Sequence, residues 1–129
     1  CGPCVIEMPD LDNLQHKYGA AGLKVIAISI DEEGADKVRE FYRENKLKNL
    51  EIFTDTDGSS AAAFGAKKLP TSFLIDHEGK AVGIVDGFAR WDKPGYEEHI
   101  QKALKRRAKT LAEENTPFQN NRRVMGVNN

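Results

Sequence analysis

The feature that most constrains the fold is a nearly continuous apolar run at residues 24–30, KVIAISI. Runs of this kind are typical of parallel sheets, because helices cover both faces of each strand. Segments in which apolar residues recur at helical spacing precede and follow the run. The chain is therefore predicted to fold as an α/β domain with helices on both faces of its sheet.

The rest of the chain alternates helical and extended patterns. The expected order is helix 1–18, strand 24–30, helix 35–45, short strand 50–53, short helix 59–64, a loop entering a strand at 69–76, strand 81–85 and a helix from Pro94. A β-α-β unit followed by a β-hairpin and a helix predicts a mixed sheet flanked by helices.

Local signals set several of these boundaries. Gly65 is expected to end the short helix, and Gly79 supplies the positive φ of the hairpin turn at 77–80. Pro94 suits the first position of the last helix. The inward face of that helix is predicted to carry Tyr96, Ile100, Ala103, Leu104, Ala108 and Leu111.

Composition bounds the class of protein. The 129 residues are 40% hydrophobic and 30% charged, as in a water-soluble domain. Residues 1–114 are expected to form that domain and residues 115–129 a polar tail. Nineteen basic and twenty acidic residues give a net charge of −1, so no strong field favours nucleic acid or an anionic membrane. No apolar run approaches the ~20 residues that span a bilayer.

The only two cysteines stand at the start of the chain, in Cys1-Gly2-Pro3-Cys4. This spacing brings two sulfurs close enough for a disulfide that is readily made and broken. Gly2 and Pro3 suit a tight turn into a helix. If Cys1 caps that helix, unpaired backbone N–H groups and the helix dipole favour its thiolate, which is the nucleophilic form. The motif therefore indicates a redox-active dithiol.

Three other interpretations of the motif remain open at this stage. A structural disulfide across two residues closes a loop too short to stabilise much. A zinc site needs about four ligands, and His16, His77 and His99 have no ligand-like spacing. The third interpretation, lipid modification of Cys1, would consume the nucleophile and has no visible signal sequence in its support.

Three stretches resemble the TlpA-like and ResA-like thiol–disulfide reductases of the thioredoxin superfamily. CVIEMP at residues 4–9 resembles the family's C-x-x-E-x-P, and VIAISID at 25–31 resembles its VVAVSVD strand. LPTSFLID at 69–76, with Gly79, resembles its P-T-T-F-L-I-D-x-x-G stretch. Residues 34–68 correspond to a helix and strand that this branch inserts, as peroxiredoxins do. The resemblance covers about residues 1–104 and implies a thioredoxin-like fold.

The resemblance also implies roles for individual residues. Cys1 would be the exposed attacking thiolate, and Cys4 the more buried thiol that closes the disulfide. Glu7, one turn beyond Cys4, would tune thiol protonation or shuttle a proton; the alternative is a solvated helix carboxylate.

Substrate binding would fall to Gly2, Pro3, Leu69 and Pro70. The resemblance implies a cis peptide bond between Leu69 and Pro70, beside the two sulfurs. The backbone of Leu69 would then be free to pair with a substrate strand.

One departure from the family concerns the region before the motif. In this fold an internal strand precedes the Cys-x-x-Cys helix, and a Trp usually stands just before the motif. An internal gap would leave backbone groups of the sheet unpaired, which is costly. We therefore expect that the sequence is an N-terminally truncated piece of a longer polypeptide, or that another segment or chain fills the gap. A signal peptide or membrane anchor would also lie upstream.

The predicted activity is reduction of protein disulfides by dithiol–disulfide exchange through Cys1 and Cys4, without metal or organic cofactor. Gly2-Pro3 resembles the dipeptide of reducing thioredoxins, although a dipeptide does not settle direction. The implied partners are protein thiol or disulfide substrates, such as apocytochromes c, and an upstream thiol reductant. The implied location is the bacterial periplasm or the extracytoplasmic face of a membrane, with the cytoplasm as the alternative.

Two other functions stay open. A peroxiredoxin-like thiol peroxidase would share the inserted region, but the Pro-x-x-x-Thr-x-x-Cys setting is absent. A non-enzymatic copper-binding module of the same fold would pair the cysteines with a histidine, for which His77 and His99 are candidates.

Overall fold

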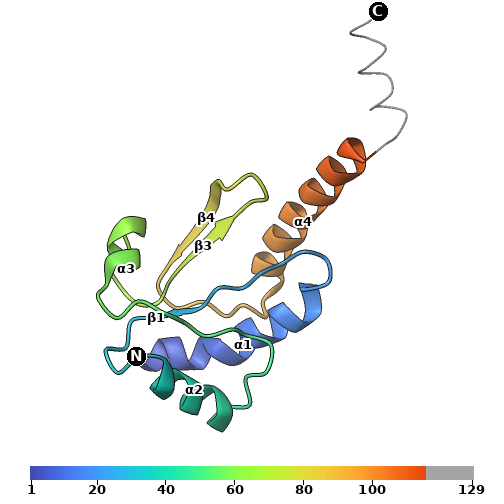
Figure 1. The fold of residues 1–129 in the computed structure, drawn as a ribbon. Helices are drawn as coiled ribbons and strands as arrows, with labels where there is room; N and C mark the ends of the chain where they lie inside the picture. Colours follow the sequence, from blue (N-terminus) through green and yellow to red (C-terminus); the bar gives the residue numbers. More distant parts are fainter. Residues whose placement is uncertain (116–129) are drawn as a thin grey trace, which may run out of the picture.

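The computed structural model describes residues 1–115, and Figure 1 shows the arrangement of its elements. Residues 116–129, which include nearly all of the predicted tail, lie outside the described residues. The elements are α1 (Gly2–Tyr18), β1 (Ile28–Ser29), α2 (Ala35–Glu44), β2 (Phe53–Thr54), α3 (Ser59–Phe64), β3 (Thr71–Ile75), β4 (Ala81–Asp86) and α4 (Pro94–Glu114). This order of helices and strands confirms the predicted α/β class.

Helix α1 begins as its sequence predicts. Cys1 is the N-cap residue, and its Sγ accepts a hydrogen bond from the backbone N–H of Cys4 at 3.3 Å. Pro3 lies in the first turn, where helical N–H groups have no intrahelical partner and a proline loses nothing. The helix continues through Pro9 and ends at Gly19.

The strands of the described region form two pairs rather than one continuous sheet. β1 runs parallel to β2, with Ile28 opposite Phe53, and β3 runs antiparallel to β4, with Phe73 opposite Ile84. The predicted hairpin is therefore confirmed, and the mixture of parallel and antiparallel pairing is present. No ladder joins the two pairs among the described residues.

The strand predicted at residues 24–30 is shorter in the structure than expected. Only Ile28 and Ser29 form ladder pairs, and the expected burial on both faces is wrong. Alternate side chains of a strand point to opposite faces. Val25, on one face, packs against the helices, whereas Ile26, Ile28 and Ile30 are 40–55% exposed. The exposed face has no covering element among the described residues.

The core lies around α1 and consists of two clusters. One contains Val38, Tyr42, Leu47 and Leu50, and joins α2 and the following loop to Met8 and Leu11 of α1. The other contains Leu14, Tyr18 and Ile100, and joins α1 to α4. Leu11 and Val25 contact both clusters. The helix that carries the two cysteines is therefore the element around which the rest of the domain packs.

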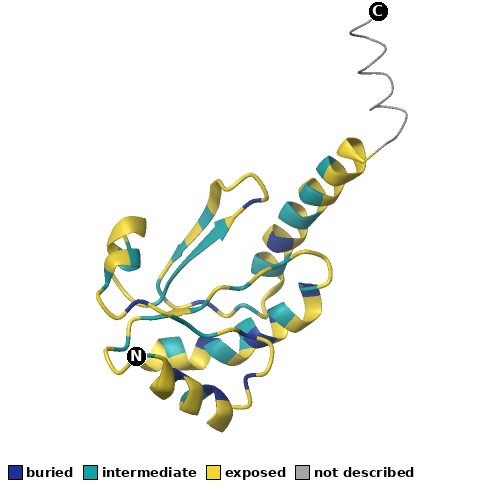
Figure 2. Ribbon diagram, viewed as in Figure 1, coloured by how far each residue is buried: buried dark blue, intermediate teal, exposed yellow. Residues whose placement is uncertain are grey.

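The buried face of the last helix, α4, is shorter than predicted. Ile100 is buried, and Tyr96, Ala103 and Leu104 are partly buried, as expected. Ala108 and Leu111 are exposed, which corrects the predicted stripe. Figure 2 shows the reason: the C-terminal turns of α4 project beyond α1 and the loops that pack on its first turns.

Candidate active site

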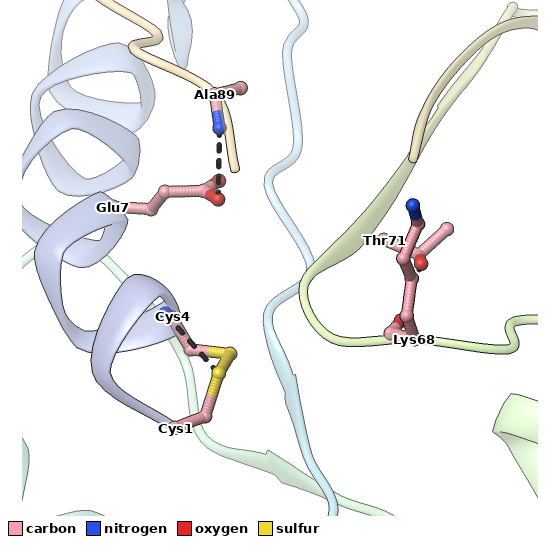
Figure 3. The surroundings of a disulfide bond; sticks show 6 residues. All are labelled: Cys1, Cys4, Glu7, Lys68, Thr71 and Ala89. Carbon is pink, nitrogen blue, oxygen red and sulfur yellow. Dashed lines mark hydrogen bonds between the residues drawn. A yellow bond between two sulfur atoms is a disulfide. The ribbon is translucent and has the colours of Figure 1, made fainter. Parts of the chain in front are cut away.

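The two cysteines form a disulfide at the N-terminus of α1. The S–S distance is 2.09 Å, and the two Cα atoms are 5.3 Å apart, a Cα separation usual for a disulfide. Cys1 is exposed and Cys4 is partly buried, and Figure 3 shows both side chains directed to the same side of the helix. An attacking reagent therefore reaches the sulfur of Cys1 more easily than that of Cys4.

The start of α1 supplies an environment that favours a thiolate. The backbone N–H of Cys4 points at the sulfur of Cys1, and the N-terminal end of a helix carries a partial positive charge. Donated hydrogen bonds and positive potential both stabilise the charged form of a thiol. When the disulfide is reduced, this environment therefore favours the thiolate form of Cys1 over the thiol.

Glu7 lies one turn along α1 from Cys4 and is 2% exposed. Its Oε2 accepts a hydrogen bond from the backbone N–H of Ala89 at 3.2 Å, and its Oε1 accepts one from Nε1 of Trp91 at 2.5 Å. Figure 3 shows its carboxylate on the side of α1 to which the sulfurs also point. The alternative of a solvated helix carboxylate is therefore wrong.

Trp91 and Ala89 are the partners of Glu7 that sequence reasoning missed. They lie 84 and 82 residues away along the chain, so no spacing pattern connects them. A partial signal existed in Trp91, the only tryptophan, because a buried indole N–H needs an acceptor.

The loop before β3 forms the opposite side of the site. The Leu69–Pro70 peptide bond is cis, as the resemblance implied. The carbonyl of Pro70 accepts a hydrogen bond from the N–H of Gly87 at 3.0 Å, and the Thr71 hydroxyl donates one to the carbonyl of Lys68 at 2.5 Å. Figure 3 shows Lys68 on this loop and Thr71 at the start of β3, across from the sulfurs. Leu69 itself is 44% exposed.

Metal binding has no structural support in the described part of the chain. Among residues 1–115, no group of three or more His, Cys, Asp or Glu side chains could hold a metal ion. His77, one copper candidate, lies in the hairpin turn with its Nε2 3.7 Å from Glu78. A search of the same residues for a helix long and apolar enough to cross a membrane finds none.

Known proteins similar to this chain include several named thiol-disulfide oxidoreductase ResA. The protein of Bacillus thuringiensis subsp. konkukian is 35% identical over 102 residues, which make up 79% of this chain and 57% of that protein. The protein of Bacillus subtilis is 32% identical over 87 residues, 67% of this chain and 48% of that protein. The chain therefore spans about half the length of these relatives.

Solved structures similar to this chain are also thiol–disulfide or thioredoxin proteins by description. A structure described as a thiol:disulfide interchange protein DsbE from Chlorobium tepidum matches with a TM-score of 0.70 and 33% identity, over 81% of this chain and 72% of that one. The exposed lipoprotein thioredoxin Etrx1 of Streptococcus pneumoniae matches with a TM-score of 0.61 and 26% identity, over 82% of this chain and 76% of that one. The Redoxin family matches residues 1–100. The chain therefore belongs to the Redoxin family and is a ResA-like member of the thioredoxin superfamily.

Proposed function

We propose that the chain is a thiol–disulfide oxidoreductase that reduces protein disulfides through Cys1 and Cys4. The observation that carries the proposal is the Cys1–Cys4 disulfide at the N-terminus of α1, with the more exposed sulfur at the helix cap. The names of the similar proteins from Bacillus and Chlorobium support it.

The exchange proceeds in two steps. The Cys1 thiolate attacks one sulfur of a partner disulfide, so a mixed disulfide forms and the partner's other sulfur leaves as a thiolate. The Cys4 thiolate then attacks the sulfur of Cys1, which releases the first partner sulfur. The partner gains two electrons and two protons, and the Cys1–Cys4 pair becomes the disulfide. A thiol reductant restores the dithiol.

Glu7 is proposed to tune the protonation of the two thiols. Its carboxylate lies one turn from Cys4, because residues three apart share a helix face. A negative charge in a buried site acts strongly on a neighbouring ionisable group. Glu7 thereby opposes the build-up of negative charge on the sulfurs, and sets which of them loses its proton during the exchange.

Gly2, Pro3, Leu69 and Pro70 are proposed to bind the substrate. Gly2 and Pro3 are exposed beside the attacking sulfur, and Leu69 is exposed on the opposite loop. An extended partner segment can lie between them, with its disulfide at Cys1 and its backbone beside that of Leu69. Main-chain pairing of this kind accepts many sequences, which suits an enzyme with more than one protein substrate.

The direction and setting are also proposals. Gly2-Pro3 resembles the dipeptide of reducing thioredoxins, so we place the chain on the reducing side, with protein disulfides such as those of apocytochromes c as substrates and a thiol protein as reductant. The proposed location is the periplasm or the extracytoplasmic face of a bacterial membrane.

Reduction of insulin disulfides tests the activity. With dithiothreitol as reductant, the chain should accelerate insulin precipitation, and Cys1→Ser should abolish the acceleration. Absence of acceleration by the wild-type chain would overturn the proposal. Peroxide consumption far faster than that of a free thiol would favour the peroxidase alternative instead.

A further inference from the structure

We infer that Trp91 is a positioning residue for the redox site and acts through Glu7; the inference rests on the proposed function. The indole N–H of Trp91 donates to Oε1 of Glu7 at 2.5 Å. Trp91 follows β4 and is distant in sequence from the Cys-Gly-Pro-Cys motif. Its indole N–H nevertheless contacts Glu7, the first carboxylate after that motif on α1.

The geometry holds the carboxylate in one orientation. The two oxygens of Glu7 have different donors, a backbone N–H on Oε2 and the indole N–H on Oε1. The backbone donor at Ala89 is 2% exposed, like Glu7 itself. Rotation of the carboxylate would break both bonds in a buried place, where an unmade hydrogen bond is costly.

Trp91 is itself held in place by packing. Its ring is tilted against that of Tyr96 in α4, with centroids 5.0 Å apart, and it contacts the cluster of Leu14, Tyr18 and Ile100. Both α4 and α1 therefore support the indole. The indole that donates to Glu7 is therefore packed against the core.

Other charges on the neighbouring segments are paired among themselves. Arg90, between the two donors, lies 3.9 Å from Asp10 of α1 and 3.7 Å from Asp92. Across the site, Lys68 lies 3.6 Å from Asp86. These pairs are more exposed than Glu7 and are screened by water. Glu7 differs because it is 2% exposed and the two donors on its oxygens are uncharged.

The effect of Trp91 on the thiols follows from this arrangement. A donated hydrogen bond offsets part of the carboxylate charge. Without the indole donor, Glu7 would oppose thiolate formation more strongly. Without the carboxylate, that opposition disappears and Trp91 has nothing to act through. The two changes should therefore shift thiol reactivity in opposite directions.

The test is the pH dependence of iodoacetamide alkylation of Cys1 and Cys4 in the reduced chain, with each cysteine quantified by mass spectrometry. Trp91→Phe keeps the ring and should slow Cys4 alkylation at neutral pH about two- to threefold. Glu7→Gln should speed it, by about tenfold. The double variant should match Glu7→Gln, since coupled residues are not additive.

Tyr96→Phe is the matched control, because it alters the same ring pair without touching the carboxylate; its alkylation profile should equal that of the wild type. An unchanged profile in Trp91→Phe, or the same slowing in the Glu7→Gln background, would overturn the inference. If Glu7→Gln does not fold, as judged by circular dichroism, the comparison of Trp91→Phe with Tyr96→Phe decides alone. Insulin reduction by the wild-type chain is scored separately, so failure of the proposed function is distinguishable from failure of the inference.

Discussion

The carboxylate of Asp12 accepts two hydrogen bonds from Asn49, one from its backbone N–H at 2.8 Å and one from its side-chain amide at 3.0 Å. Asp12 lies on α1 and is 8% exposed, and Asn49 lies in the loop that leads to β2. The pair joins α1 to the segment after α2, beside the cluster that contains Leu47 and Leu50.

Asp12→Ala should destabilise the domain by about 1–3 kcal/mol, because two hydrogen bonds to a buried, charged acceptor are lost. Urea unfolding followed by circular dichroism measures the change. Asp36→Ala is the control: that side chain is 96% exposed and lies 2.7 Å from Arg39 in a surface ion pair, so its loss should change stability by less than about 0.5 kcal/mol. Equal effects of the two substitutions would contradict a stabilising role for the Asp12–Asn49 hydrogen bonds.

Gly79 in the hairpin turn has φ +84°, and a Cβ there would meet no atom within 4 Å. Gly79→Ala should therefore cost about 1 kcal/mol through backbone conformation alone. Gly95, in the first turn of α4, also has open space around it but lies in a helix. Gly95→Ala should be neutral or stabilising by up to about 1 kcal/mol. The unfolding midpoints of the two variants should move in opposite directions, and a shared direction would contradict this account.

Asp76 links the stability of the hairpin to pH. The backbone N–H groups of Lys80 and Glu78 donate to its carboxylate and hold the pKa of Asp76 below its ordinary value of 3.8. A carboxyl group with a lowered pKa stabilises the folded state fully above its unfolded pKa. This stabilisation is lost as pH falls below about 4 and through the folded pKa.

Asp76→Asn should remove this acid-dependent part of the stability. We expect the variant to have a lower unfolding midpoint than the wild type at pH 7, and the difference to shrink as pH falls toward 3. Asp36→Asn, at an exposed site, serves as the control in the same urea titrations. A difference that stays constant from pH 7 to pH 3 would exclude Asp76 as the group responsible.

Sequence reasoning succeeded where the signal is local. The bounds of α3 match the prediction because glycines flank it, and Gly58 and Gly65 both adopt the left-handed conformation. The cap at Cys1 and the turn at Gly79 are local in the same sense.

Sequence reasoning failed where burial or hydrogen bonding depends on residues that are distant in the chain. The run at residues 24–30 is apolar enough for two covered faces, but burial depends on which elements reach it, and Ile26, Ile28 and Ile30 remain exposed. The bonds of Asp12 to Asn49 and of Glu7 to Trp91 join residues 37 and 84 positions apart. No periodicity or motif records such pairs.

Cys4→Ser should trap the substrate. Without the resolving thiol, the mixed disulfide at Cys1 cannot be released by the second step, so covalent complexes should accumulate and disappear on reduction. They should be visible as slower bands in non-reducing gels when the variant is expressed in a bacterial periplasm. Cys1→Ser should give no such complexes. Equal trapping by both variants would contradict the assignment of Cys1 as nucleophile.

The sequence predicts an internal strand between the two strand pairs, and this prediction is still to be tested. β1 pairs only with β2, and β3 only with β4, within residues 1–115. Strand edges left open expose unpaired backbone groups, and the exposed Ile26, Ile28 and Ile30 lie on the segment that contains β1. We expect a strand supplied by a further segment or by a second chain to hydrogen-bond to the open edge of β1 and to join the two strand pairs.

Amide hydrogen exchange measures whether the open edge of β1 becomes paired. In a longer polypeptide that carries such a strand, amides of residues 25–30 should exchange about tenfold or more slowly than in the present chain, because pairing must open before exchange. Amides of α2 (Ala35–Glu44), whose hydrogen bonds lie within the helix, provide the internal control and should change less. Identical exchange at residues 25–30 in both polypeptides would rule out pairing by the added segment. Protection that instead rises with the concentration of the present chain would mean that a second copy supplies the strand.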